Sequence, residues 1–71
     1  MKKSHVVTAE AVTFHCLYAD TALEVVDELR RIVLYYTERA EFDKREAPMF
    51  SNTSLYHDDE QWTMELFVKE I

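Results

Sequence analysis

Two clusters of side chains bring together groups that could do chemistry. In the first, His15 and Cys16 are adjacent and combine an imidazole base with a thiol, as in cysteine nucleophiles. The surrounding residues alternate with period two, however, and successive side chains of a strand point to opposite faces of a sheet. We therefore do not expect the pair to meet. Cys16 is predicted to be a small buried hydrophobe, and His15 a residue of the solvent side or of an interface.

The second cluster is the run His57-Asp58-Asp59-Glu60, which sets an imidazole beside three carboxylates. Its functional interpretation is a weak site for a divalent metal or for proton transfer. Calcium normally takes more oxygen ligands and a turn assisted by glycine, and zinc takes three or four converging ligands. Asp is common in turns, so a solvated hairpin turn is favoured. Glu60 and Glu65 would need a sugar cleft to act as a glycosidase pair, which so small a fold scarcely provides.

Glycine is absent from all 71 residues, although an average usage of about 7% would give roughly five. Phosphate-binding loops, dinucleotide fingerprints and nucleophile elbows all need glycine, because their backbone takes positive φ values or approaches a ligand closely. The commonest classes of nucleotide-dependent enzyme are therefore excluded. We expect a protein that is not an enzyme, with no catalytic residue, no metal and no cofactor.

Composition bounds the remaining possibilities. The length predicts one domain over residues 1–71, and 48% hydrophobic with 13% aromatic residues predicts a folded core. With 14 acidic against 8 basic residues the net charge is −6, which disfavours direct binding of nucleic acid. A single cysteine, no export signal and no apolar run of about 18 residues favour a cytoplasmic protein that does not engage a membrane.

The strongest periodic signal predicts a helix from about Thr21 to about Phe42 or beyond. Thr21 and Glu24 match a capping box at its start, and Pro48 forbids continuation past Ala47. An apolar stripe recurs at steps of three and four residues, as expected for a helix with one buried face. The stripe consists of Ala22, Val25, Val26, Leu29, Ile32, Val33, Tyr36 and Ala40.

Three strands are predicted around this helix. The first runs from Val6 to Tyr18, with Val12, Phe14, Cys16 and Tyr18 on the apolar face and a bulge near Glu10, or a frayed N-terminal segment, to reconcile the parity of Val7, Ala9 and Ala11. The others form a hairpin. Its arms are Thr53 to His57 and a segment whose apolar face is Trp62, Met64, Leu66 and Val68. Because no Gly or Asn stands at Asp58-Asp59-Glu60, we expect a four- or five-residue loop on a type I turn.

These elements predict an α+β fold of order β-α-β-β. A three-stranded antiparallel sheet in the order 1-3-2 would carry the long helix on one face, with the last strand in the centre. The face away from the helix is then expected to hold Thr13, His15, Leu17, Thr63, Phe67 and Ile71. Two sheet edges remain open, and a symmetric homodimer would be the simplest way to protect them.

Candidate partner-binding residues lie on the outer side of the helix and in the acidic turn. Leu23 and Leu34 fall about 20° apart on a helical wheel, with Arg30 on the same side and Tyr35 also directed away from the core. The alternative is that these are isolated exposed side chains, which are normal. In the turn, Asp58, Asp59 and Glu60 either form a solvated surface or imitate phosphates in the basic groove of a partner.

The function expected from these features is that of a non-enzymatic protein-binding module. It would be a small acidic inhibitor or adaptor that blocks a basic, nucleic-acid-handling partner, as phage-encoded anti-defence proteins of the anti-restriction or anti-CRISPR type do. This association is by type alone, and no residue pattern carries a family resemblance. The alternative is a homodimeric scaffold or an antitoxin-like subunit without nucleic-acid mimicry.

Overall fold

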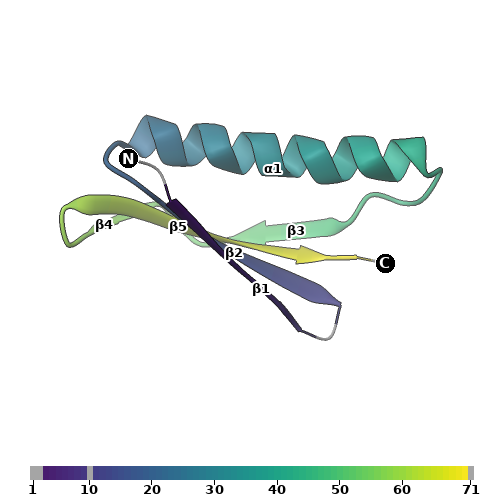
Figure 1. Cartoon of the computed structure of the whole chain (residues 1–71), viewed down its shortest axis with the longest axis horizontal. Helices are drawn as coiled ribbons and strands as arrows, with labels where there is room; N and C mark the ends of the chain where they lie inside the picture. Colours follow the sequence, from purple (N-terminus) through teal and green to yellow (C-terminus); the bar gives the residue numbers. More distant parts are fainter. Residues whose placement is uncertain (1–2, 10, 71) are drawn as a thin grey trace.

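A computed structural model describes residues 3–9 and 11–70. One long helix lies across one face of an antiparallel sheet (Figure 1). The elements are β1 (Lys3–Ala9), β2 (Val12–Ala19), α1 (Ala22–Phe42), β3 (Met49–Asn52), β4 (Tyr56–Asp58) and β5 (Gln61–Lys69). The strand order is β1-β2-β5-β3, and β4 also pairs with β5. The prediction of an α+β fold is confirmed, but the sheet has five strands and not three.

The two extra strands come from segments whose roles were predicted wrongly. The segment expected to be one strand from Val6 to Tyr18 turns back on itself, and β1 pairs with β2 from Lys3 opposite Tyr18 to Ala9 opposite Val12. The bulge predicted near Glu10 falls on a residue outside the described ones. The predicted connector after the helix contains β3, which shares one edge of β5 with β4 and pairs further along it.

Local hydrogen bonds fix both ends of α1 close to the predicted positions. The Glu24 amide donates to the Thr21 hydroxyl oxygen at 3.2 Å, so Thr21 is the N-cap. At the other end the Arg45 amide donates to the Ala40 carbonyl at 2.8 Å, and the Lys44 amide to the Glu41 carbonyl at 3.1 Å. This pair of bonds is the Schellman motif, and it places Lys44 in the left-handed region at φ 56°.

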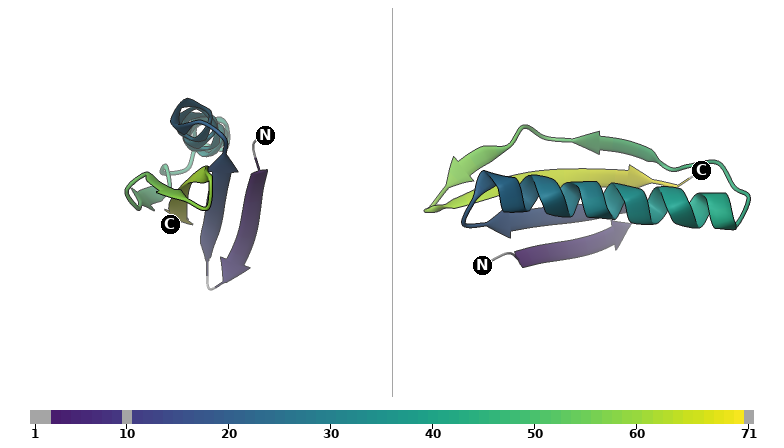
Figure 2. Two further views of the ribbon diagram at one scale, coloured as in Figure 1. Left: turned by 90° about the vertical axis from the view of Figure 1, so that its left-hand side faces the viewer. Right: turned by 90° about the horizontal axis from the view of Figure 1, so that it is seen from above.

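The core lies between α1 and the two central strands (Figure 2). Leu17 stands directly opposite Met64 and Ala19 opposite Trp62, and directly opposed residues of an antiparallel pair share a face. The helix residue Val25 packs with them and is fully buried. The predicted packing of the Trp62, Met64, Leu66 and Val68 face against the helix is confirmed. Leu29, Ile32, Leu55 and Trp62 surround the buried cluster.

The predicted orientation of β2 is wrong. Leu17 and His15 face the helix and are buried, and Thr13 shares their face, whereas Phe14 and Cys16 lie on the far face. Each parity of this strand holds apolar residues, Leu17 and Ala19 on one and Phe14 and Cys16 on the other, so alternation did not identify the buried face. Of the residues expected on the far face, Thr63 and Phe67 lie there, while Ile71 is outside the described part of the chain.

The loop between β4 and β5 is shorter than predicted. Asp58 pairs with Gln61, so Asp59 and Glu60 alone make the turn, and the predicted four- or five-residue loop is wrong. Their φ angles of 46° and 69° are both positive, which is the pattern of a type I′ turn. The twist of this turn matches that of the flanking strands, and this match outweighs the cost of left-handed backbone in a chain without glycine.

Candidate protein-binding interface

The sheet face opposite α1 is left uncovered by the described elements (Figure 2). A row of residues crosses it, because the strand registers place Val7 opposite Phe14, Phe14 opposite Phe67, and Phe67 opposite Ser51. The rings of Phe14 and Phe67 pack with their centroids 5.1 Å apart. Val7 is 47% exposed, Phe67 36% and the neighbouring Met49 61%. We call Val7, Val12, Phe14, Met49 and Phe67 the open-face patch.

Charged and phenolic side chains border the open-face patch. Glu65 and Lys69 lie two residues before and after Phe67 on β5, and therefore on the same face as Phe67. Thr63 precedes Glu65 on the same face of β5, and it stands opposite Tyr18 on β2 and Tyr56 on β4. Desolvation raises the pKa of Tyr56, and the Glu65 carboxylate raises it further. The patch thus has an apolar centre with a carboxylate on one side and an ammonium on the other.

The structure separates His15 from Cys16, as their adjacency on a strand required. Cys16 is buried on the open face, where its hydrogen bond with Tyr18 is the main cause that raises the pKa of that tyrosine. His15 lies under the helix, and its Nε2 is hydrogen-bonded to the Tyr36 hydroxyl at 3.1 Å. The burial of Cys16 is confirmed. The prediction of a solvent-side His15 is wrong, because Tyr36 supplies a partner that lets an imidazole be buried.

Burial lowers the pKa of His15 from its ordinary value of 6.5, which predicts a pH-dependent stability. The unfolded state then binds more protons than the folded state between the two pKa values, so the free energy of unfolding rises with pH there. This contribution is complete above about pH 6.5 and is lost as the pH falls through the lower pKa of the folded protein. Urea unfolding between pH 5 and 8 measures it.

A variant pair separates His15 from other titrating groups in that experiment. In the variant His15→Leu the free energy of unfolding is expected to depend less on pH between pH 5 and 7, because Leu fits beside Leu66 and carries no titratable proton. His57→Gln is the matched control and should keep the dependence, since His57 is exposed. If the free energy of unfolding of His15→Leu still rose with pH as in the wild type, a group other than His15 would be responsible.

The predicted partner-binding residues of the helix are all exposed, but they do not form one continuous surface. Leu23 and Leu34 stand eleven residues apart, about 16 Å along the helix axis. Arg30 lies 4.0 Å from the Asp27 carboxylate. Tyr35 is directed toward the C-terminal end, where its hydroxyl accepts a hydrogen bond from Arg39 at 2.7 Å. That these residues bind a partner stays a prediction.

The acidic turn lies at the tip of the β4–β5 hairpin, at the end of the molecule where α1 begins (Figure 1). Asp58, Asp59 and Glu60 are exposed there. The ring of His57 packs edge-on against Trp62 with centroids 5.1 Å apart, on the opposite strand parity to Asp58. The arrangement therefore presents carboxylates to solvent and does not converge the imidazole with them.

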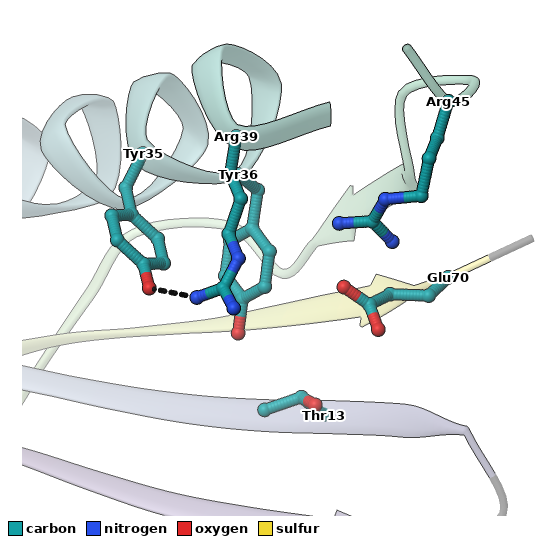
Figure 3. Close-up of a pocket in the computed structure, with 6 residues that line it drawn as sticks. All are labelled: Thr13, Tyr35, Tyr36, Arg39, Arg45 and Glu70. Atoms are coloured by element: carbon teal, nitrogen blue, oxygen red, sulfur yellow. Dashed lines mark hydrogen bonds between the residues drawn. The ribbon is translucent and has the colours of Figure 1, made fainter. Parts of the chain in front are cut away.

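A polar depression of about 380 Å³ at the other end of α1 was missed by sequence reasoning (Figure 3). Arg39 and Arg45 reach into it, and the Glu70 carboxylate projects between them. Arg45 also pairs with Asp43 at 3.2 Å. The hydrogen bond to Tyr35 is the main cause that raises the pKa of Arg39, with smaller effects from Asp43 and Glu70. Because carboxylates of the chain itself balance both guanidinium groups, we assign no ligand to the depression.

Within residues 3–9 and 11–70, no three His, Cys, Asp or Glu side chains group closely enough to hold a metal ion. No helix in the described part of the chain combines the length and apolarity needed to cross a bilayer. Comparison of the chain with protein-family models, curated proteins and solved structures found no match in any of the three.

Proposed function

We propose that this protein is a non-enzymatic protein-binding module and that the open-face patch is its principal binding surface. The observation that carries the proposal is the exposed apolar row across the uncovered sheet face. A solvated face of an antiparallel sheet normally carries polar side chains. Two phenylalanines, two valines and a methionine instead leave apolar surface in water, whose burial is favourable by about 25 cal/mol per Å².

The composition of the patch fits a protein partner better than a small ligand. Aromatic residues and methionine are enriched in the cores of protein interfaces, and charges are concentrated at the rims. A small molecule would need a concave site that encloses most of its surface. Phe67 and Phe14 instead lie side by side on a sheet surface, which suits contact with another extended surface.

A second candidate function is the acidic inhibitor or adaptor expected from the composition. It is favoured by the exposure of Asp58, Asp59 and Glu60 together at a hairpin tip, where they could enter the basic groove of a nucleic-acid-handling partner. Along the helix, by contrast, Arg30 and Arg31 lie within 4.0 Å of Asp27 and Glu28. Mimicry of a phosphate array is therefore restricted to the turn in this proposal.

The two candidate functions are tested by measuring how two variants bind a protein partner isolated from a cell lysate. The open-face variant Val7→Ser with Phe67→Ser is expected to weaken binding about 30-fold or more, mainly through faster dissociation, because it removes exposed anchors. The turn variant Asp58→Asn, Asp59→Asn and Glu60→Gln would instead slow association and flatten its salt dependence if the acidic turn is the contact.

The helix variant Phe42→Ser is the matched control, since Phe42 is exposed and belongs to α1, which lies on the opposite side of the sheet from the open-face patch. Circular dichroism of each variant shows that the fold is retained. Full affinity of the open-face variant would contradict the proposed surface. In that case, an altered association rate in the turn variant would favour the acidic inhibitor.

A further inference from the structure

The open face carries a charge pattern that is complementary to itself. Along β5 the residues facing away from the helix include Glu65, Phe67 and Lys69, in the order negative, apolar, positive. The apolar residue in the middle belongs to the row Val7, Phe14, Phe67, Ser51, which runs across the strands. The row therefore divides an acidic position from a basic one.

A twofold axis along this row would bring unlike charges together. Two sheets stacked face to face about such an axis have antiparallel β5 strands, so the Phe67 side chains meet and each Glu65 faces the other copy's Lys69. Aligned sheets pack with their strands turned by about 30°, which displaces a position two residues from the axis by only about 3 Å. An axis parallel to β5 would instead oppose Glu65 to Glu65. The charges thus select the antiparallel arrangement.

The area that two copies share about this axis is small. The axis passes through Phe67, two residues from the end of β5, so only residues 65–69 of this strand face the other copy. Four strand positions at about 4.8 Å spacing, over five residues at about 3.3 Å each, give roughly 300 Å² per protomer, or about 600 Å² for the pair. This area lies below the range of stable specific interfaces and corresponds to a weak, rapidly reversible dimer.

We infer that the open-face patch binds a second copy of this chain, with the two sheets face to face and the β5 strands antiparallel. This inference rests on the proposed function, in which the open face is a protein-binding surface. The dimer buries Phe67 and Phe14 at its centre and pairs Glu65 with Lys69 at both ends. It leaves the two helices and the two acidic turns on the outside.

Sedimentation equilibrium of the full chain and a set of charge variants tests this arrangement. The wild type is expected to dimerise weakly, with a dissociation constant of roughly 100 μM. Glu65→Lys and Lys69→Glu should each weaken dimerisation by at least tenfold, because each opposes two like-charged pairs. The double variant Glu65→Lys with Lys69→Glu should return to within about threefold of the wild type, since the pairs are restored with their signs exchanged.

Net charge provides an internal control. Glu65→Lys changes the charge of each chain from −6 to −6 + 2 = −4, and Lys69→Glu changes it to −6 − 2 = −8. General repulsion between acidic chains would therefore strengthen the dimer of the first variant and weaken that of the second. Specific pairing weakens both. The exposed helix variant Phe42→Ser should leave the dissociation constant unchanged.

Three results would overturn the inference. They are an 8.5 kDa monomer up to several hundred micromolar, a dimer that neither charge reversal weakens, and a dimer that survives Phe67→Ser, which would pair through a sheet edge. These failures are distinct from failure of the proposed function. A wild-type monomer whose other partner still requires Phe67 would retain the open face as a binding surface.

Discussion

Replacing Leu17 with alanine is expected to lower the free energy of unfolding by about 2 to 5 kcal/mol. Leu17 is fully buried between Met64 on β5 and Val25 on the helix, so the deletion loses apolar transfer energy and leaves a cavity. At 0.05 to 0.15 kcal/mol per residue, a chain of 71 residues has roughly 4 to 10 kcal/mol in total. The variant is therefore expected to lose a large fraction of its stability and to unfold at a much lower urea concentration.

Urea unfolding followed by circular dichroism measures this loss, with Leu34→Ala as the matched control. Leu34 is 52% exposed on the helix, so the same chemical change there should stay within about 0.5 kcal/mol of the wild type. If both variants lost the same small amount, Leu17 would not lie in the core, and the observed orientation of β2 would be wrong.

The helix and the last strand were predictable because each offers a single interpretation. In α1 the Thr21 cap and the apolar stripe indicate the start and the buried face of the helix, and Pro48 excludes its continuation past Ala47. The observed helix ends at Phe42, within that limit. In β5 the helix-facing residues are apolar while the other parity contains Thr63, Glu65 and Lys69. Polar residues on one parity identify the buried face, and the prediction for this strand is confirmed.

The orientation of β2 could not be predicted from its own residues. The helix-facing parity holds Leu17 and Ala19 but also His15, and the other parity holds Phe14 and Cys16. By residue type, a face with a histidine and a leucine is less suited to a core than a face with a phenylalanine and a cysteine. Which parity faces the helix is decided by contacts with residues far away in the sequence. His15 is hydrogen-bonded to the Tyr36 hydroxyl, and Leu17 stands opposite Met64.

The same inversion explains why the proposed binding surface was only partly anticipated. Phe67 was expected on the uncovered face, but its partner Phe14 was placed in the core, so no aromatic row was visible. Val7 belongs to β1, a strand that was not predicted and that pairs with β2. The depression at Arg39 and Arg45 likewise joins the helix end to β2 and Glu70, a proximity that no local pattern encodes.

Glycine substitutions at three turn positions are expected to raise the free energy of unfolding by about 2 kcal/mol together. Ala11, Lys44 and Glu60 have φ angles of 65°, 56° and 69°, where a side chain beyond Cα costs about 1 to 2 kcal/mol per residue. Glycine removes this cost, but it also increases the conformational entropy of the unfolded chain. That increase offsets about half of the gain in the free energy of unfolding. We leave Asp59 unchanged because Asp tolerates the left-handed region.

The three sites lie in different turns, so their effects should add, and thermal unfolding of single and triple variants measures them. For a domain of this size about 2 kcal/mol corresponds to a rise of roughly 10 °C in Tm. Ala47→Gly is the matched control: Ala47 is exposed and its φ is not positive, so glycine there acts only on the unfolded chain and should lower Tm slightly. A triple variant that also lowered Tm would show that these residues do not have left-handed backbone. That result would remove the basis for the two-residue turn at Asp59 and Glu60, which sets the register of β4 on β5.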